Sequence, residues 1–109
     1  MTVEEIFNKL GAHMVEGIMI HDQMCNAYNF LGLCGFSALH AHQHIEETKC
    51  YIELSHYYTT RFHKLINLGV IENPKIIPEN WYKYTTMNVD AGTRKNAVKE
   101  MMTKWVKWE

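Results

Sequence analysis

Mostly apolar residues recur in alternating steps of four and three from Val3 to Leu31, with Gly17 and His21 in the series, and this spacing constrains the fold more than any other feature of the chain. An α-helix has about 3.6 residues per turn, so such steps place these side chains on one stripe of a helix. The pattern is typical of a seam between two packed helices. Ile6, Ile20 and Ala27 widen the stripe on one side, so we expect more than one neighbouring element to cover it.

The ends of this first helix can also be predicted. Thr2 and Glu5 have the spacing of a capping box, in which each side chain binds the backbone N–H of the other residue. The sequence Gly32-Leu33-Cys34-Gly35 then breaks the pattern, as a short turn between two helices does. We therefore predict a helix over about residues 3–32.

A second stripe with the same spacing runs from Ala41 to Ile66. Ser37 is a suitable N-cap and Gly69 a suitable stop, which predicts a helix over about residues 37–68 that packs antiparallel to the first. Residues 69–89 hold both prolines and are interpreted as a connector, and residues 91–108 have the apolar face of a third helix. The sequence thus predicts an all-α protein that forms a single domain over residues 1–109: a long antiparallel two-helix hairpin, a connector and a C-terminal helix.

Charge and cysteine content narrow the functional classes. The chain has 11 basic and 12 acidic residues with no long run of either sign, which argues against a nucleic-acid binder that works by bulk charge and against an acidic mimic of DNA. Three cysteines are an odd number for a disulfide framework. No apolar run approaches the roughly 20 residues that span a bilayer. We expect a cytoplasmic protein with reduced cysteines, no membrane contact and no sequence-specific binding to nucleic acid.

Two short motifs of His and Glu indicate a metal site. The predicted first helix contains His13-x-x-Glu16 and the second contains Glu53-x-x-His56. If the turn is centred between Cys34 and Gly35, antiparallel packing brings both pairs to the same level. Residues three apart are neighbours on a helix, with Cβ atoms about 5–6 Å apart, so all four side chains could reach one ion. Two imidazoles and two carboxylates suit zinc, iron or manganese. The alternative is that these groups form a hydrated rim beside the seam.

A second group of candidate ligands lies nearer the predicted turn. Its members are histidines of both predicted helices together with one carboxylate and one thiol: His21, Cys25, His40, His44 and Glu47. A histidine on a helix seam is more often a core residue that is satisfied by one hydrogen bond. A metal site and a structural role in the core therefore both stay open for this group.

The first of these motif sets resembles part of a known family. Glu53-x-x-His56 on one long helix, with Glu16 on the preceding helix, resembles half of a ferritin-like di-iron site, in which each half supplies a Glu and a Glu-x-x-His. It is also similar to the encapsulated ferritins, whose two-helix subunits dimerise. The resemblance covers about residues 10–60 and departs from the family at His13 and in its single Glu-x-x-His. It implies a homodimer that binds and oxidises iron.

A second resemblance covers most of the chain. Residues 13–24, residues 81–84 and Trp105-Val-Lys-Trp108 are similar to small proteins encoded by phages and mobile elements of Gram-positive bacteria. Proteins of that origin include zinc-containing inhibitors of the Cas9 nuclease, which implies a non-catalytic protein that holds zinc in a bacterial host and binds a larger protein. The expected partner surface combines aromatic and basic side chains, namely Trp81, Tyr82, Tyr84, Lys99 and Trp105. We therefore expect a zinc-containing binding protein, with a ferritin-like iron protein as the alternative.

Overall fold

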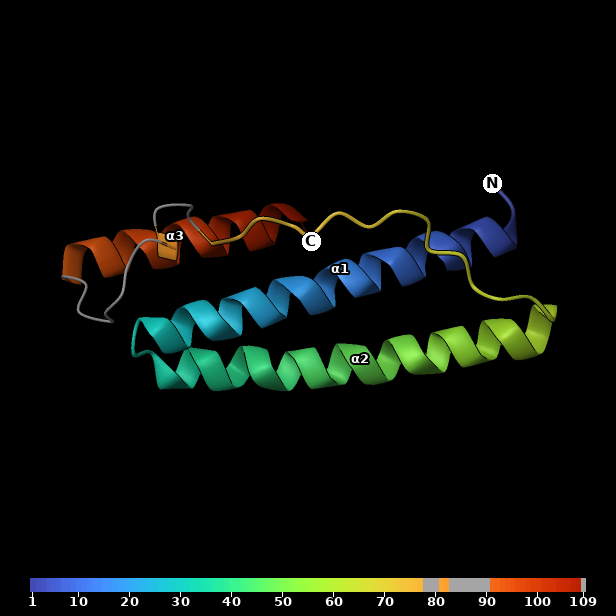
Figure 1. The fold of residues 1–109 in the computed structure, drawn as a ribbon, viewed down its shortest axis with the longest axis horizontal. Coiled ribbons are helices and arrows are strands. Elements are labelled where there is room, and N and C mark those ends of the chain that lie inside the picture. Colours follow the sequence, from blue (N-terminus) through green and yellow to red (C-terminus); the bar gives the residue numbers. More distant parts are fainter. Residues whose placement is uncertain (78–80, 83–90, 109) are drawn as a thin grey trace.

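Two long helices and a third, shorter one make up the fold in the computed structural model. Helices α1 (Val3–Phe30) and α2 (Cys34–Phe62) form an antiparallel hairpin, and α3 (Ala91–Trp108) runs beside the half of α1 that is next to the turn (Figure 1). The structure describes residues 1–77, 81–82 and 91–108, and it shows no β-strand in that part of the chain. The all-α architecture predicted from the sequence is confirmed.

Helix α1 begins and ends close to the predicted positions. The Thr2 hydroxyl accepts a hydrogen bond from the Glu5 N–H at 3.1 Å, and the Glu5 carboxylate accepts one from the Thr2 N–H at 3.4 Å, so the predicted capping box is present. The chain leaves the helix after Phe30 and turns at Gly32, whose φ of 75° lies in the left-handed region that favours glycine. The turn is thus Leu31–Leu33, slightly earlier in the chain than predicted.

Helix α2 differs from its predicted range of 37–68 at both ends. It begins at Cys34, three residues before the predicted cap Ser37. Ser37 does not cap the helix, since its hydroxyl donates to the backbone carbonyl of Cys25 at 3.0 Å. It ends at Phe62, where His63 adopts a left-handed conformation with a φ of 55°. Beyond this point Lys64 and Asn67 bind Glu4 and Asn8 of α1 at 2.9 and 3.0 Å, so the chain turns back along α1 (Figure 1).

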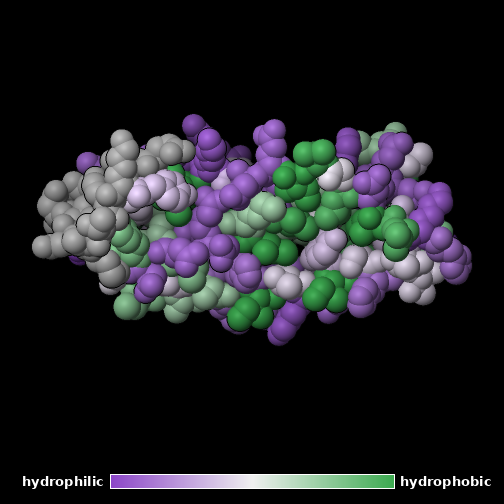
Figure 2. Space-filling model, viewed as in Figure 1, coloured by the Kyte–Doolittle hydropathy of each residue, from purple (hydrophilic) through white to green (hydrophobic). Residues whose placement is uncertain are grey.

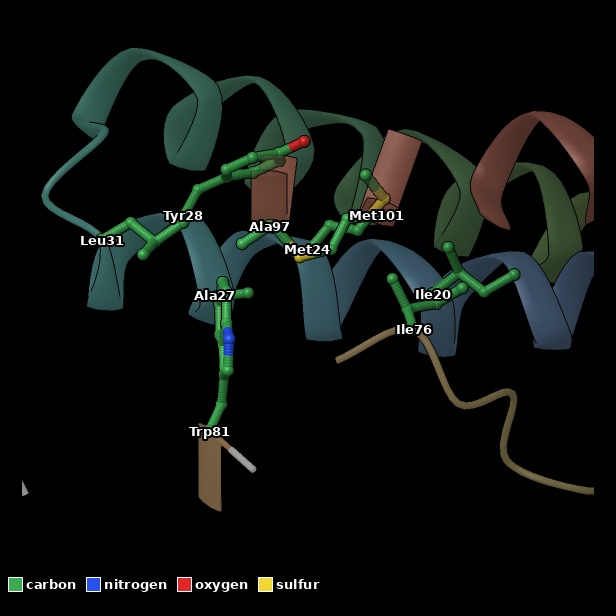
Figure 3. Close-up of a cluster of buried hydrophobic side chains, with 9 residues drawn as sticks. All are labelled: Ile20, Met24, Ala27, Tyr28, Leu31, Ile76, Trp81, Ala97 and Met101. Atoms are coloured by element: carbon green, nitrogen blue, oxygen red, sulfur yellow. The ribbon is translucent and has the colours of Figure 1, made fainter. Parts of the chain in front are cut away.

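The buried core lies near the turn of the hairpin (Figure 3). Ile20 and Ala27 of α1 belong to this core together with Ile76 and Trp81 from the segment after α2, so more than α2 covers the stripe there, as predicted, whereas Ile6 is 49% exposed. Helix α3 adds Ala97 and Met101. The complete set of buried apolar residues in this cluster is Ile20, Met24, Ala27, Tyr28, Leu31, Ile76, Trp81, Ala97 and Met101.

Helix α2 faces α1 with a different side from the one predicted. The predicted stripe from Ala41 to Ile66, with its steps of four and three, places Ile45 and Ile52 on the seam, but these side chains are 52% and 45% exposed. The buried residues of α2 are His40 and Tyr58 instead, which contact Tyr28 and Phe7 of α1 through their rings. The helix is therefore rotated relative to the prediction, so that His40 and Tyr58 face α1 in place of Ile45 and Ile52.

The molecule is elongated, with principal extents of 53 × 23 × 22 Å. Figure 2 shows hydrophobic surface in the middle and right of the visible face, toward the end of the molecule that carries the N-terminus. Over the described residues, no helix combines the length and the apolar character that crossing a membrane requires.

Candidate functional site

The ring contacts between α1 and α2 define which residues face each other in the hairpin. His21 lies against His40 with ring centroids 5.1 Å apart, and Phe7 lies against Tyr57 at 5.7 Å. His13 is therefore level with the region around Tyr51, and the predicted pairing of His13 with His56 does not occur. The reason is the position of the turn, which lies at Leu31–Leu33 and not between Cys34 and Gly35.

The four ligands of the first predicted metal site are not brought together. The His13 ring stacks on Trp108 of α3, with centroids 4.1 Å apart and an angle of 10° between the planes. The Glu16 carboxylate accepts a hydrogen bond from Trp108 Nε1 at 3.0 Å. Glu53 and His56 are both exposed on α2. His13 and Glu16 thus hold α3 against the hairpin, and Glu53 and His56 lie apart from them.

The structure does bring together part of the second predicted group. His21 and His40 are each 1% exposed, and their Nδ1 atoms are 2.9 Å apart. The other ring nitrogen of His21, Nε2, lies 3.5 Å from Oε1 of Glu47. One Nδ1 must carry a hydrogen and the other must accept it, because two unprotonated nitrogens cannot bond to each other. A carboxylate beside Nε2 favours a hydrogen on that nitrogen, which makes Nδ1 of a neutral His21 the acceptor.

Aromatic rings enclose this histidine pair. Tyr28 stacks on His40 with centroids 5.4 Å apart. Trp105 of α3 approaches both imidazoles edge-on, at 5.6 Å from His21 and 5.2 Å from His40. All three helices therefore meet at His21 and His40, and the two rings form part of the core.

Burial changes the protonation chemistry of this group. Loss of hydration in the core, followed by repulsion from a charged His21, lowers the pKa of His40 from 6.5 to about 4. Burial also raises the pKa of the Tyr28 hydroxyl above 10.0. His40 is consequently neutral near pH 7, and a proton on the pair belongs on His21, between His40 and the Glu47 carboxylate.

Cys25 and His44, the remaining members of the second group, have other partners. Cys25 Sγ lies 3.5 Å from the Ser37 hydroxyl. His44 Nδ1 donates to the backbone carbonyl of Ile18 at 3.2 Å. Both side chains are half-buried between α1 and α2, where their hydrogen bonds connect the two helices.

The arrangement does not fit a structural metal centre. A closed zinc site has four protein ligands in tetrahedral geometry, and the described residues contain no group of three or more His, Cys, Asp and Glu side chains placed to hold an ion. His21 and His40 offer two converging nitrogens, but Glu47 lies on the opposite nitrogen of His21. The group is better described as a hydrogen-bonded pair of histidines with the Glu47 carboxylate beside the outer nitrogen of His21.

The residues predicted to bind a partner lie in different environments. Trp81 is 7% exposed and packs against Phe30 with centroids 5.9 Å apart, and Trp105 is half-buried against the histidine pair. Tyr82 and Lys99 are exposed. Tyr84 lies outside the described residues. The two tryptophans are therefore packing residues, because their large apolar rings fill space between the helices, and Tyr82 and Lys99 remain at the surface.

Two residues outside the predicted ligand sets matter at this site: Trp108, which was not predicted to contact it, and Gly17, whose place in a helix interior predicts a close approach. Trp108 holds the end of α3 against His13 and Glu16, and Gly17 leaves room for it: a Cβ atom on Gly17 would lie 2.9 Å from Trp108 Cη2 and closer still to Oε2 of Glu47. A glycine in a helix interior costs about 1 kcal/mol relative to alanine. A glycine at this position of a predicted helix therefore indicates that another group packs closely against it.

Comparison with known proteins gives no relative for this chain: none of the family models, curated proteins or solved structures matches it.

Proposed function

We propose that the protein is a non-catalytic helical protein that acts by binding a larger protein through the outward side of α3. The observation that carries this proposal is the distribution of charge. Helix α3 has one acidic residue, Glu100, and five basic residues, whereas the whole chain has 12 acidic and 11 basic residues. The basic residues of α3 are Arg94, Lys95, Lys99, Lys104 and Lys107.

The exposed part of α3 suits a partner with an acidic surface. Lys95, Lys99 and Lys107 are exposed, so their charges can attract such a partner and orient it during association. Tyr82 is 68% exposed and borders a small apolar pocket lined by Ala27, Phe30, Ile77 and Trp81. An aromatic side chain beside an apolar pocket is typical of the residues that dominate binding energy in protein interfaces.

The burial of His21 and His40 supports a role for this pair without catalysis. A general acid or base must come within hydrogen-bond distance of its substrate, and His21 and His40 are each 1% exposed. His13, Glu16, His21 and His40 contact Trp105 and Trp108. Their proposed role is to hold α3 in place so that its basic side stays displayed.

The concrete candidate for the partner is Cas9, which the resemblance to small phage and mobile-element proteins suggests. Zinc is not part of this proposal, since the candidate ligands do not fit a zinc site. The ferritin-like alternative receives no support from Glu53 and His56, which are exposed, or from Glu16, which binds Trp108.

Binding of purified Cas9 tests the proposal. We expect the double variant Lys99→Glu with Lys107→Glu to weaken binding by about tenfold or more, because it reverses two exposed charges of α3. Lys49→Glu is the matched control, since Lys49 is exposed on α2, and it should bind like the wild type. Absence of wild-type binding would reject Cas9 as the partner. If the double variant and Lys49→Glu lose Cas9 binding equally, the α3 surface is not the binding site. If the wild type binds duplex DNA and the double variant loses that binding to the same extent as it loses Cas9 binding, the partner of α3 is nucleic acid.

A further inference from the structure

Residues 65–77, which we call the strap, run back along α1 after the end of α2 (Figure 1). The strap forms no helix or strand, so its backbone groups need hydrogen-bond partners outside regular secondary structure. Gln23 of α1 makes three hydrogen bonds to it. Nε2 of Gln23 donates to Oδ1 of Asn73 at 2.9 Å and to the carbonyl of Pro74, and Oε1 accepts from the Ile76 N–H at 3.1 Å.

These partners favour an amide side chain at position 23. The Pro74 carbonyl can only accept a hydrogen, whereas the Ile76 N–H can only donate one. A single side chain that bonds to both must therefore carry a donor and an acceptor side by side. Glutamine does so, whereas an ionised glutamate only accepts and a lysine only donates.

The hydrogen bonds of Gln23 also determine which residue of the strap enters the core. Ile76 is buried beside Ile20 and Ala27 (Figure 3), but the next residue, Ile77, has an identical side chain. Apolar burial has no preferred direction, so it distinguishes poorly between two neighbouring isoleucines. The bond from the Ile76 N–H to Gln23 has a fixed direction and length, and it therefore selects Ile76.

Gln23 lies on the same side of α1 as the small apolar pocket next to Tyr82. The pocket is lined by residues of α1 and by residues at and after the end of the strap, namely Asn26, Ala27, Phe30, Ile77, Trp81 and Tyr82. The three positions of α1 lie three, four and seven residues after Gln23, a spacing that places them on its side of the helix. Ile77 directly follows the bonded Ile76. The position of the strap on α1 therefore sets the shape of the pocket.

We propose that Gln23 is a positioning residue for the binding surface, because it fixes the strap on α1 and so holds Tyr82 and its pocket in the shape that the partner meets. This inference rests on the proposed function. Gln23 is half-buried and bonded to the strap, whereas Tyr82 is 68% exposed. The partner therefore contacts Tyr82, and Gln23 acts on binding through the strap.

Hydrogen exchange of the full chain tests whether Gln23 holds the strap. Gln23→Leu keeps the approximate size of the side chain and removes all three bonds, so exchange over residues 73–77 should become about tenfold faster or more. Gln23→Glu has no donor at pH 7 and should also accelerate exchange. The matched control is Gln43→Leu, since Gln43 is a half-buried glutamine of α2, and it should leave exchange over these residues unchanged.

Binding to purified Cas9 then tests whether this hold matters for function. Gln23→Leu should weaken binding by about fivefold or more, with helix content unchanged by circular dichroism, and Gln43→Leu should bind like the wild type. If Gln23→Leu does not fold, Asn73→Ala replaces it: this variant removes one of the three bonds and should accelerate exchange by about threefold.

The two measurements separate this inference from the proposed function. Wild-type exchange rates over residues 73–77 in both Gln23 variants, or faster exchange with unchanged Cas9 binding, would overturn the positioning role. A wild type that does not bind Cas9 would reject the proposed function and the positioning role with it, whereas faster exchange in Gln23→Leu would still show that Gln23 holds the strap.

Discussion

The contact between His21 Nδ1 and His40 Nδ1, at 2.9 Å, requires one ring to accept a hydrogen from the other. Two positively charged imidazoles at this distance would repel each other strongly in a core where both are 1% exposed. The pair therefore holds at most one extra proton. The Glu47 carboxylate, 3.5 Å from His21 Nε2, favours placing this proton on His21. The fold depends on a neutral His40.

Acid should destabilise the protein through His40. Burial and the charge on His21 lower the pKa of His40 from 6.5 to about 4, so the unfolded chain takes up this proton first as pH falls. The stability that depends on neutral His40 is thus fully present above pH 6.5 and is lost as pH falls toward 4, by about 3 kcal/mol. Urea denaturation at a series of pH values measures this loss. His40→Gln cannot titrate, so an equally steep pH dependence in that variant would contradict the assignment.

Gly17 and Gly35 make a matched pair for testing close packing. A Cβ on Gly17 would meet Glu47 Oε2 and Trp108, whereas a Cβ on Gly35 would have nothing within 4 Å. We expect Gly17→Ala to lower the free energy of unfolding by about 1–3 kcal/mol through overpacking. Gly35→Ala should raise it by up to about 1 kcal/mol through higher helix propensity. Thermal denaturation of both variants measures these changes, and a stabilised Gly17→Ala would show that Glu47 and Trp108 move aside freely.

Among the helices, the sequence predicted the architecture correctly, but it did not predict which residues of α1 and α2 lie level with each other. Periodicity and the Thr2–Glu5 capping box are local signals, and both predicted α1 correctly. The turn was placed too late because Cys34 and Gly35 are tolerated in the first turn of α2. This shift of the turn moved His56 away from His13, and the predicted four-ligand site depended on that pairing.

The end of α2 and the role of the histidines depend on contacts between distant residues. Helix α2 ends early where Lys64 and Asn67 bind residues of α1, and local spacing does not reveal such contacts. The second histidine group was predicted in part, since His21, His40 and Glu47 do meet. The stacking of His13 on Trp108 joins residues nearly a whole chain length apart, and no motif in the sequence connects them.

Trp108 should control whether α3 stays docked. Its ring stacks on His13 and its Nε1 donates to Glu16, so Trp108→Ala removes both contacts at the end of the helix. We expect the free energy of local opening of α3 to fall by about 2–4 kcal/mol. Hydrogen exchange should become faster over residues 101–108 and stay unchanged in the middle of α1. Val106→Ala is the control, because Val106 is 69% exposed, and comparable acceleration in that variant would argue against a role for Trp108.

For the molecule as a whole, stability should not require a metal ion. His21 and His40 already bond to each other, and the other candidate ligands have partners or are exposed. Dialysis against a chelator should therefore leave the melting temperature unchanged within about 1 °C. Elemental analysis before and after dialysis establishes that any bound metal has been removed. A lower melting temperature that zinc restores would mean that these ligands rearrange around an ion.

The concentration of basic residues on α3 has a consequence for the electrical behaviour of the molecule. Helix α3 carries five basic residues and one acidic residue, and the rest of the chain carries six basic and eleven acidic residues. A formal net charge of −1 is therefore the sum of a basic helix and an acidic remainder of the chain. At low salt near neutral pH we therefore expect the molecule to adsorb to a negatively charged surface through the exposed Lys95, Lys99 and Lys107, although its own net charge is negative.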